Sequence, residues 1–268
     1  FIMKTVLFIW QDGKLFWQWS RLIELIRHVN KQQAYYESEN ILVDIGLDSG
    51  KMSAIRAIAM DNVGGVRIGP QWSSVELLSS FLSKNDNIYF CWGKVEKQFF
   101  LEARSCIDTL IISGYIYDSY IELMRPHAKK LREQLKASGA QFIITLLDNR
   151  VDIHTTVEDM EYYYQSLLNE FLNDKSFGLI IKPKDPNIFN KLKNIKPIIN
   201  NARRTGRCLV LEEKSEVRKN LWKINNMFTF LPSMASDMTV NFSIGTSGTE
   251  SALAGARSVY YDHMKQPD

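Results

Sequence analysis

The chain has 268 residues, of which 45% are hydrophobic and 24% are charged, proportions that are typical of a folded globular protein. Its formal net charge of +3 is small, and its most basic segment, residues 182–196, is interrupted by prolines and an aspartate, so we expect no binding to nucleic acid. No apolar run approaches the roughly 20 residues that cross a bilayer, so we expect no transmembrane segment, while peripheral association with a membrane stays open.

The cysteines indicate a reducing compartment. Cys91, Cys106 and Cys208 lack the spacing of metal ligands, and Cys91 and Cys208 lie in strand-like apolar runs, so we expect free thiols. The first residues show no signal-peptide pattern. We therefore expect a cytoplasmic protein. Because the first residue is Phe and the sequence stops soon after a strand-like run, one interpretation is a fragment of a longer chain.

Short apolar runs alternate with helical patterns along the first half of the chain. The strand-like runs are residues 5–10, 41–45, 65–68, 88–91 and 109–113. Two stripes at helical spacing lie between them. They consist of Leu22, Leu25, Ile26 and Val29, and of Val75, Leu78 and Leu82.

A longer helix is predicted over residues 121–135, with Pro126 either near its start or at a kink, and with Ser138 and Gly139 at its end. A second series of strands follows at residues 141–147, 178–181, 207–211 and 239–243, and a last one lies after residue 256. Repeated β-α alternation favours parallel sheets covered by helices. The fold class is thus α/β, with two Rossmann-like domains facing a cleft: residues 1–125, an acceptor domain, and residues 126–268, a nucleotide-donor domain.

Ligands of open parallel sheets bind outside the carboxyl ends of the strands, so the loops there hold the candidate site residues. In the first half, residues 46–51 resemble a P-loop but have the wrong glycine spacing and Met52 in place of Ser or Thr, so a turn beside the cleft is the better interpretation. Gln71, Trp72 and Trp92 offer an amide and aromatic faces to a sugar acceptor. Packing between domains is the alternative for either Trp.

Two loops of the second half carry charged candidates. His154 follows a strand beside Asp148, and either side chain is a candidate general base, although the loop also suits a cap for a helix that begins near Thr156. Lys182 and Lys184 flank Pro183 at a strand exit, where they would neutralise phosphate charge or remain solvated.

The glycine- and hydroxyl-rich turn at residues 245–250 is the strongest candidate for binding an anion. Ser247 and Glu250 have the spacing of a capping box, which predicts a helix start near Thr249. The first amides of such a helix attract anions, while Gly245 and Gly248 allow close backbone approach and Thr246, Ser247 and Thr249 add hydroxyl groups. A merely structural capped helix is the alternative.

These last two motifs resemble those of glycosyltransferases with the two-Rossmann B-type fold (GT-B), in particular bacterial surface-polysaccharide and glycerophosphotransferase-like proteins. The resemblance covers roughly residues 139–262 and lies in the basic-Pro motif at 181–184 and the turn and helix at 243–255. It implies that Thr246, Ser247 and Thr249 bind the donor diphosphate, that Lys182 or Lys184 offsets its charge, and that Glu250 holds ribose or sugar hydroxyls. The basic motif departs from the pattern because it lacks the usual His beside Pro183.

The resemblance implies transfer of a sugar or related phosphate-linked group from a nucleotide donor to a carbohydrate acceptor. We expect no metal, since no Asp-x-Asp motif is present, and no cofactor beyond the nucleotide-activated donor, which is a substrate. Two alternatives remain at this point. One is a nucleotide-sugar epimerase, which would need no acceptor, and the other is a non-catalytic module that binds a nucleotide or a sugar.

Overall fold

The computed structural model describes residues 13–47, 50–73, 83–103, 105–152, 155–185, 187–211 and 229–261. The chain is α/β and forms two compact units, Phe1–Ile116 and Tyr117–Asp268. Each unit has its own parallel sheet within the described residues, as the β-α alternation of the sequence predicts. The two units are described separately below.

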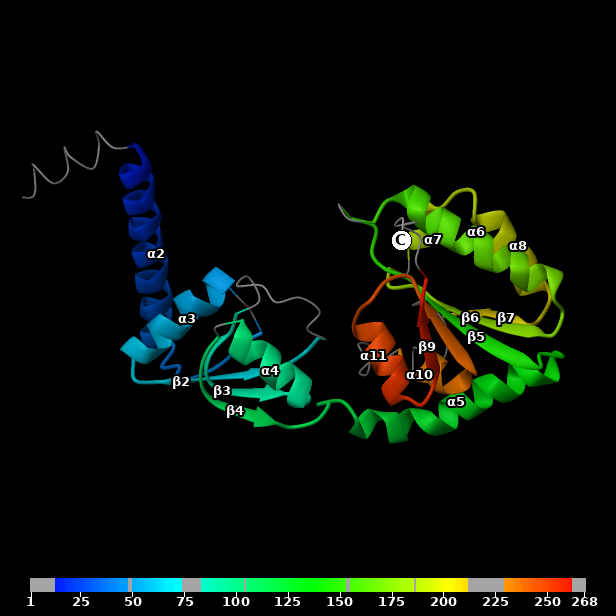
Figure 1. Cartoon of the computed structure of the whole chain (residues 1–268), viewed down its shortest axis with the longest axis horizontal. Helices are drawn as coiled ribbons and strands as arrows, with labels where there is room; N and C mark the ends of the chain where they lie inside the picture. Colours follow the sequence, from blue (N-terminus) through cyan, green and yellow to red (C-terminus); the bar gives the residue numbers. More distant parts are fainter. Residues whose placement is uncertain are drawn as a thin grey trace, which may run out of the picture. The chain divides into compact units, whose positions relative to one another are not determined.

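The sheet of unit 1 has its strands in chain order: β1 (Val43–Ile45), β2 (Val66–Pro70), β3 (Asn85–Cys91) and β4 (Cys106–Ile112). Its described helices are α2 (Gly13–Ser38), α3 (Gly50–Asn62) and α4 (Lys94–Glu102). Each strand is therefore added on the same side of the strand before it. Because crossovers between parallel strands are right-handed, their helices gather on one face of the sheet, where Figure 1 shows α3 and α4.

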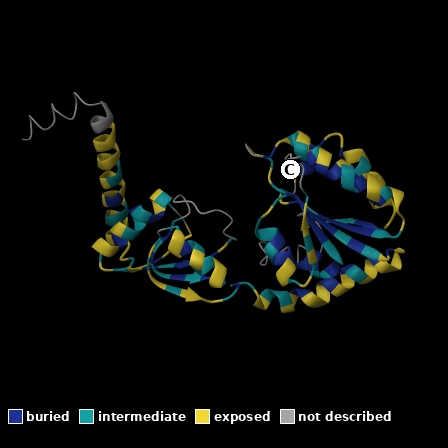
Figure 2. Cartoon of the chain, in the orientation of Figure 1, coloured by how far each residue is buried: buried dark blue, intermediate teal, exposed yellow. Residues whose placement is uncertain are grey.

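The other face of this sheet keeps apolar side chains exposed. Val43 pairs in register with Val66, and both are exposed, as are Ile45 and Ile111. Helix α2 is also only partly covered: Val29 and Tyr36 pack with residues of α3, but Leu22 and Ile26 of the predicted stripe are exposed (Figure 2). A stripe at helical spacing therefore identified the helix correctly but overestimated how much of it is buried.

The sheet of unit 2 has the order β7-β6-β5-β8-β9. In chain order these strands are β5 (Phe142–Leu147), β6 (Phe177–Lys182), β7 (Cys208–Val210), β8 (Met238–Asn241) and β9 (Arg257–Tyr260). The described helices are α5 (Ser119–Ala137), α6 (Val157–Asn173), α7 (Ile188–Lys191), α8 (Lys196–Arg204), α10 (Phe230–Ala235) and α11 (Thr246–Leu253). The first strand lies in the middle, so the strand order reverses between β5 and β8.

Helices cover both faces of this sheet. Successive residues of a strand point to opposite faces, so each strand contributes apolar side chains to the helices on both sides. In β6, Ile180 packs with the apolar residues of α5 and α10, while Leu179 and Ile181 pack with those of α6 and α8. All three side chains are at most 2% exposed. The continuous apolar runs that predicted these strands are thus explained by burial on both faces.

The ends of two helices follow the expected signals. Helix α5 ends at a Ser138 C-cap, and Gly139 has a φ of 95°, a conformation that glycine adopts without strain. Pro126 lies inside this helix. At the start of α6, the Thr156 hydroxyl accepts from the Asp159 amide and the Asp159 carboxylate accepts from the Thr156 amide, so the predicted capping box is confirmed.

The predicted strand at residues 5–10 and the stripe of Val75, Leu78 and Leu82 lie outside the described residues. Within the described ranges, no helix has both the length and the apolar run that crossing a bilayer requires.

Candidate functional site

The candidate site lies at the carboxyl edge of the unit 2 sheet, where β5 and β8 are neighbours. In open parallel sheets a crevice forms where the strand order reverses, and ligands bind there. The register pairs Leu147, the last residue of β5, with Asn241, the last residue of β8. The loops that leave these two strands begin with Asp148 and with Phe242, and the second loop leads directly into α11.

Helix α11 starts three residues earlier than the sequence predicts. Its first residue is Thr246 and its N-cap is Gly245, in a fully extended conformation and with no side-chain cap. The Gly245 carbonyl accepts from the amides of Gly248 and Thr249 at 3.1 and 3.4 Å. The predicted capping box of Ser247 and Glu250 is therefore wrong, because both residues already lie inside the helix and a glycine N-cap has no side chain to reciprocate.

The earlier start moves the end of the helix at which the sequence predicts anion binding to Thr246 and Ser247. The first amides of a helix have no intrahelical acceptor, and the dipole favours negative charge there. Thr246, Ser247 and Thr249 are half-buried, whereas Glu250 is only 9% exposed. The hydroxyl groups of the turn are thus the side chains that a ligand reaches most directly.

Gly248 lies where the helix packs against the last strand. A Cβ atom at this position would lie 2.5 Å from the hydroxyl oxygen of Tyr260 and 2.8 Å from its ring. Such distances are too short for non-bonded atoms, so a larger residue at this position would displace the partly exposed Tyr260 side chain. The sequence predicts that Gly248 allows close approach of a ligand, and in the structure it lies against Tyr260.

Asp148 is anchored at the exit of β5. One carboxylate oxygen accepts from the Lys184 backbone amide at 2.5 Å, and the other accepts from the Tyr164 hydroxyl of α6 at 2.8 Å. Burial raises the pKa of Asp148 to about 6, although these two hydrogen bonds and the nearby lysines favour the charged form. Since both oxygens already have donors, the geometry suits a positioning role better than the general-base role expected from the sequence.

Lys184 connects three strand exits. Its ammonium group donates to the Asn149 side-chain carbonyl at 2.9 Å, and the Asn149 amide donates to the Ser243 hydroxyl at 3.4 Å. Ser243 leaves β8 two residues before the Gly245 N-cap, so the contacts run from β6 through β5 to the start of α11. Lys184 is exposed, and Lys182, the last residue of β6, is half-buried.

Of the two predicted bases, only Asp148 is described, because His154 lies outside the described residues. Sequence reasoning did not assign Tyr164 or Ser243 to the site. A signal was present for Tyr164: it belongs to the buried stripe of α6, where a tyrosine hydroxyl needs a partner.

The predicted acceptor residues of unit 1 divide into two groups. Gln71 and Trp92 are buried and hold each other: the Gln71 carbonyl oxygens, from the side chain and the backbone, accept from the Trp92 amide at 2.9 Å and from its indole at 2.8 Å. The Trp92 ring also packs edge-on against Tyr115. Trp72 is 54% exposed. Of the two tryptophan rings, that of Trp72 is therefore the better candidate for contact with a sugar acceptor.

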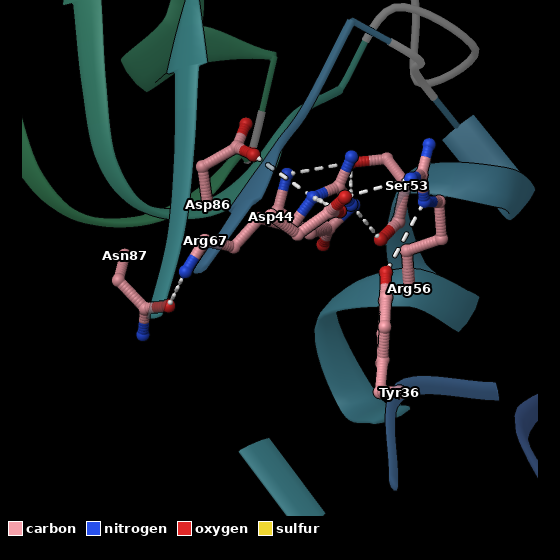
Figure 3. Close-up of polar contacts among 8 residues, drawn as sticks. Tyr36, Asp44, Ser53, Arg56, Arg67, Asp86 and Asn87 are labelled. Atoms are coloured by element: carbon pink, nitrogen blue, oxygen red, sulfur yellow. Dashed lines mark hydrogen bonds and ion pairs between the residues drawn. The ribbon is translucent and has the colours of Figure 1, made fainter. Parts of the chain in front are cut away.

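Unit 1 also contains a buried group of charges that the sequence analysis did not assign (Figure 3). Arg67 of β2 is fully buried and lies 3.3 Å from Asp44 of β1 and 3.2 Å from Asp86 of β3. The same Asp44 accepts from Arg56 of α3 at 2.7 Å. The sequence contained a signal for this group, because Asp44 and Arg67 each lie between two apolar residues of a strand-like run. A charged side chain that is buried in such a strand needs an opposite charge beside it.

Solved structures with a similar fold include two UDP-GlcNAc 2-epimerases and a protein in complex with UDP. The S. aureus protein MnaA, in complex with UDP, matches at 10% identity and a TM-score of 0.53, over 82% of this chain and 58% of that chain. The UDP-GlcNAc 2-epimerase of Methanocaldococcus jannaschii matches at 9% identity and a TM-score of 0.53, over 88% and 65%. The UDP-GlcNAc 2-epimerase of Neisseria meningitidis, bound to UDP-GlcNAc, matches at 11% identity and a TM-score of 0.50, over 91% and 65%.

The chain thus has a GT-B-like fold with two Rossmann-like halves, as the sequence predicted. It spans between 58% and 65% of the length of these three structures. Neither a comparison with protein-family models nor one with curated proteins finds a match.

Proposed function

We propose that this chain belongs to an enzyme that binds a nucleotide sugar and places its diphosphate at the start of α11. The observation that carries the proposal is the position of this helix: it begins directly after β8, at the point where the strand order of unit 2 reverses. The first amides of α11, the three half-buried hydroxyl groups of its first turn and the Lys184 ammonium group lie at this edge. Together they would balance the charge of a diphosphate.

The first candidate reaction is epimerisation of a UDP-sugar. It is favoured by the structures with the same fold, two of which are UDP-GlcNAc 2-epimerases, one of them with UDP-GlcNAc bound. The sugar would then be converted while it stays attached to its nucleotide, and no acceptor would take part.

The second candidate reaction is transfer of the sugar to a carbohydrate acceptor, which the basic-Pro motif and the hydroxyl-rich turn favour by resemblance. The exposed ring of Trp72 is then a candidate contact for the acceptor. His154 keeps the general-base role expected from the sequence, and the two residues belong to different units. The amides of α11 and Lys184 would stabilise the charge on the departing diphosphate without a metal.

The binding site is tested by replacing Thr246 and Ser247 together with alanine. We expect the affinity for UDP-GlcNAc, measured by calorimetry, to fall about thirtyfold, because each of the two lost hydroxyl contacts is worth on the order of 1 kcal/mol. Ser166→Ala is the matched control and should bind as the unmodified protein does, since the Ser166 hydroxyl donates to the Tyr162 carbonyl of its own helix, α6. Unchanged affinity in the double variant would remove the diphosphate from this turn.

The two reactions are separated by incubating the full chain with UDP-GlcNAc alone and following the sugar by NMR. An epimerase forms the second epimer without any acceptor. A transferase leaves the nucleotide sugar intact until a carbohydrate acceptor is added.

A further inference from the structure

The contacts around Asp148 form a path between the interior of unit 2 and the proposed diphosphate site. Tyr164 of α6 is fully buried and donates to Asp148, which accepts from the backbone amide of Lys184. The Lys184 side chain in turn contacts Asn149, and Asn149 contacts Ser243. One buried carboxylate thus fixes the backbone of the loop that carries the exposed lysine.

We infer that Asp148 is a positioning residue that holds Lys184 and Asn149 in place for the nucleotide diphosphate, and that it does so only when its carboxyl group is ionised. The inference rests on the function proposed above and adds a regulation by pH to the same site. It also gives Tyr164 a role, as the donor that supports the ionised form.

The chemistry of a carboxyl group explains the requirement for ionisation. A carboxylate accepts hydrogen bonds at both oxygens, whereas the protonated group turns one oxygen into a donor. When the oxygen that faces Tyr164 is protonated, the Tyr164 hydroxyl must reverse and accept, while the other oxygen still accepts from the Lys184 amide but has lost its charge. Because charge-assisted hydrogen bonds are about twice as strong as neutral ones, the contact that holds the Lys184 backbone weakens, and the ammonium group is held less firmly for the diphosphate.

The groups that face Asp148 determine where it titrates. They are Lys182 and Lys184 at the exit of β6, which favour the carboxylate, and the buried Tyr163 and Tyr164 of α6. Burial opposes the lysines and is the larger effect, so the pKa of Asp148 is raised to about 6. The carboxylate is thus mostly ionised at neutral pH and mostly protonated at pH 5.

A positioning carboxylate differs from a merely structural one in what its removal does. Keeping a charge buried costs stability, so replacing Asp148 by Asn relieves that cost, while the Lys184 amide then has a neutral and weaker acceptor in place of a charged one. The combination that we expect, weaker ligand binding without a loss of stability, would not follow if Asp148 served only to hold the fold together.

The first test measures the affinity for UDP-GlcNAc between pH 5 and pH 8 by calorimetry, because the diphosphate of this probe is a diester that keeps its charge over this range. The unmodified chain should bind about tenfold more weakly at pH 5 than at pH 7.5, with an inflection near pH 6. Asp148→Asn should bind weakly at every pH, without the inflection. Tyr164→Phe removes a donor to the carboxylate, so its inflection should move to higher pH.

Two control variants accompany this test. Asp185→Asn lies on the same loop, outside the contacts with Asp148, and should keep both the affinity and the inflection. His154→Gln should also keep the inflection, because the inference assigns the inflection to Asp148 alone. An inflection that persists in Asp148→Asn, or that disappears in His154→Gln, would overturn the inference.

The second test needs no ligand. The amide proton of Lys184 is followed by NMR during a pH titration of the full chain, and its chemical shift should change with a midpoint near pH 6 that moves upward in Tyr164→Phe. A shift that does not respond to pH would overturn the inference by itself. Failure to bind UDP-GlcNAc at any pH, with the amide titrating as expected, would instead count against the proposed function alone.

Discussion

The buried ion pairs of Arg67 join residues that are far apart in the sequence. Arg67 is fully buried and is separated by about twenty residues from each of the two aspartates that it contacts, Asp44 and Asp86. Taking charges out of water is costly, and the attraction between them offsets the cost only while every partner is present. A single replacement is therefore far more damaging than removal of the whole group.

Replacing Arg67 by Met should lower the free energy of unfolding by about 3–5 kcal/mol, because Asp86 and Asp44 stay buried beside fewer positive charges. The measurement is denaturant unfolding of the full chain. The control is the triple variant Arg67→Met, Asp44→Asn, Asp86→Asn, which should regain a large part of the loss. Equal stability of the single variant and the unmodified chain would show that these charges contribute little.

Asp148 gives a second prediction for a single residue. Its pKa of about 6 lies above the usual value for an aspartate in an unfolded chain, roughly 3.9, so the folded state binds the proton more tightly. Stability that comes from this group is therefore present at acid pH and lost as the pH rises from about 4 to about 6, by on the order of 3 kcal/mol. Comparing the unfolding free energies of the unmodified chain and Asp148→Asn at pH 5 and pH 7.5 isolates this contribution. Identical pH dependence in both proteins would contradict it.

At the scale of elements, the first turn of α11, where we propose that the diphosphate binds, packs against β9. Gly248 of the helix lies so close to the Tyr260 side chain that a larger residue would displace that ring. The surroundings of Thr246 and Ser247 therefore include a packing contact that neither residue makes.

Gly248→Ala should lower the stability of unit 2 and the affinity for UDP-GlcNAc only slightly, since the added methyl group displaces the Tyr260 side chain. The cost should be about 1 kcal/mol, at the low end for overpacking, because the Tyr260 side chain is partly exposed and can move. Tyr260→Ala makes room for the methyl group, so the double variant should be less affected than the sum of the two single variants. Strict additivity in this double-mutant cycle, measured by unfolding and by calorimetry, would argue against the contact.

The sequence predicts the elements of this fold better than their ends. Strands such as β5 and β6 are continuous apolar runs because both faces are buried, and such runs are recognisable without any partner. The start of α11 was misplaced because Ser247 and Glu250 match a local pattern, whereas the helix is begun by an extended glycine whose role depends on the strand before it. Local patterns do not contain that information.

The sequence predicts those residues of the candidate site that directly follow a strand. Asp148 and Lys184 follow predicted strands, and the rule for parallel sheets places both at one edge. The contact between them was not predictable, because it depends on which strands are neighbours. The same limit explains why Gln71 and Trp92, which suit a sugar by residue type, bind each other in the structure.

At the scale of the whole molecule, each unit has a separate sheet, and the proposed diphosphate contacts lie within unit 2. A ligand that binds only the folded form stabilises the part that binds it. The two units should therefore respond differently to the same nucleotide sugar.

UDP-GlcNAc should raise the midpoint of the thermal transition of unit 2 and leave that of unit 1 nearly unchanged. The two are distinguished by fluorescence, since five of the six tryptophans, Trp10, Trp17, Trp19, Trp72 and Trp92, belong to unit 1. Scanning calorimetry reports both transitions. A tryptophan transition that rises together with the calorimetric one would show that the two units unfold as one.

The strand order of unit 2 has a consequence for the protein during its synthesis. The central strand, β5, leaves the ribosome early, but Gly248 and Tyr260 are translated more than a hundred residues after Phe142. A nascent chain thus completes most of its interior before it has the strand against which α11 rests. A nucleotide bound as we propose would therefore stabilise the finished polypeptide and not the growing one.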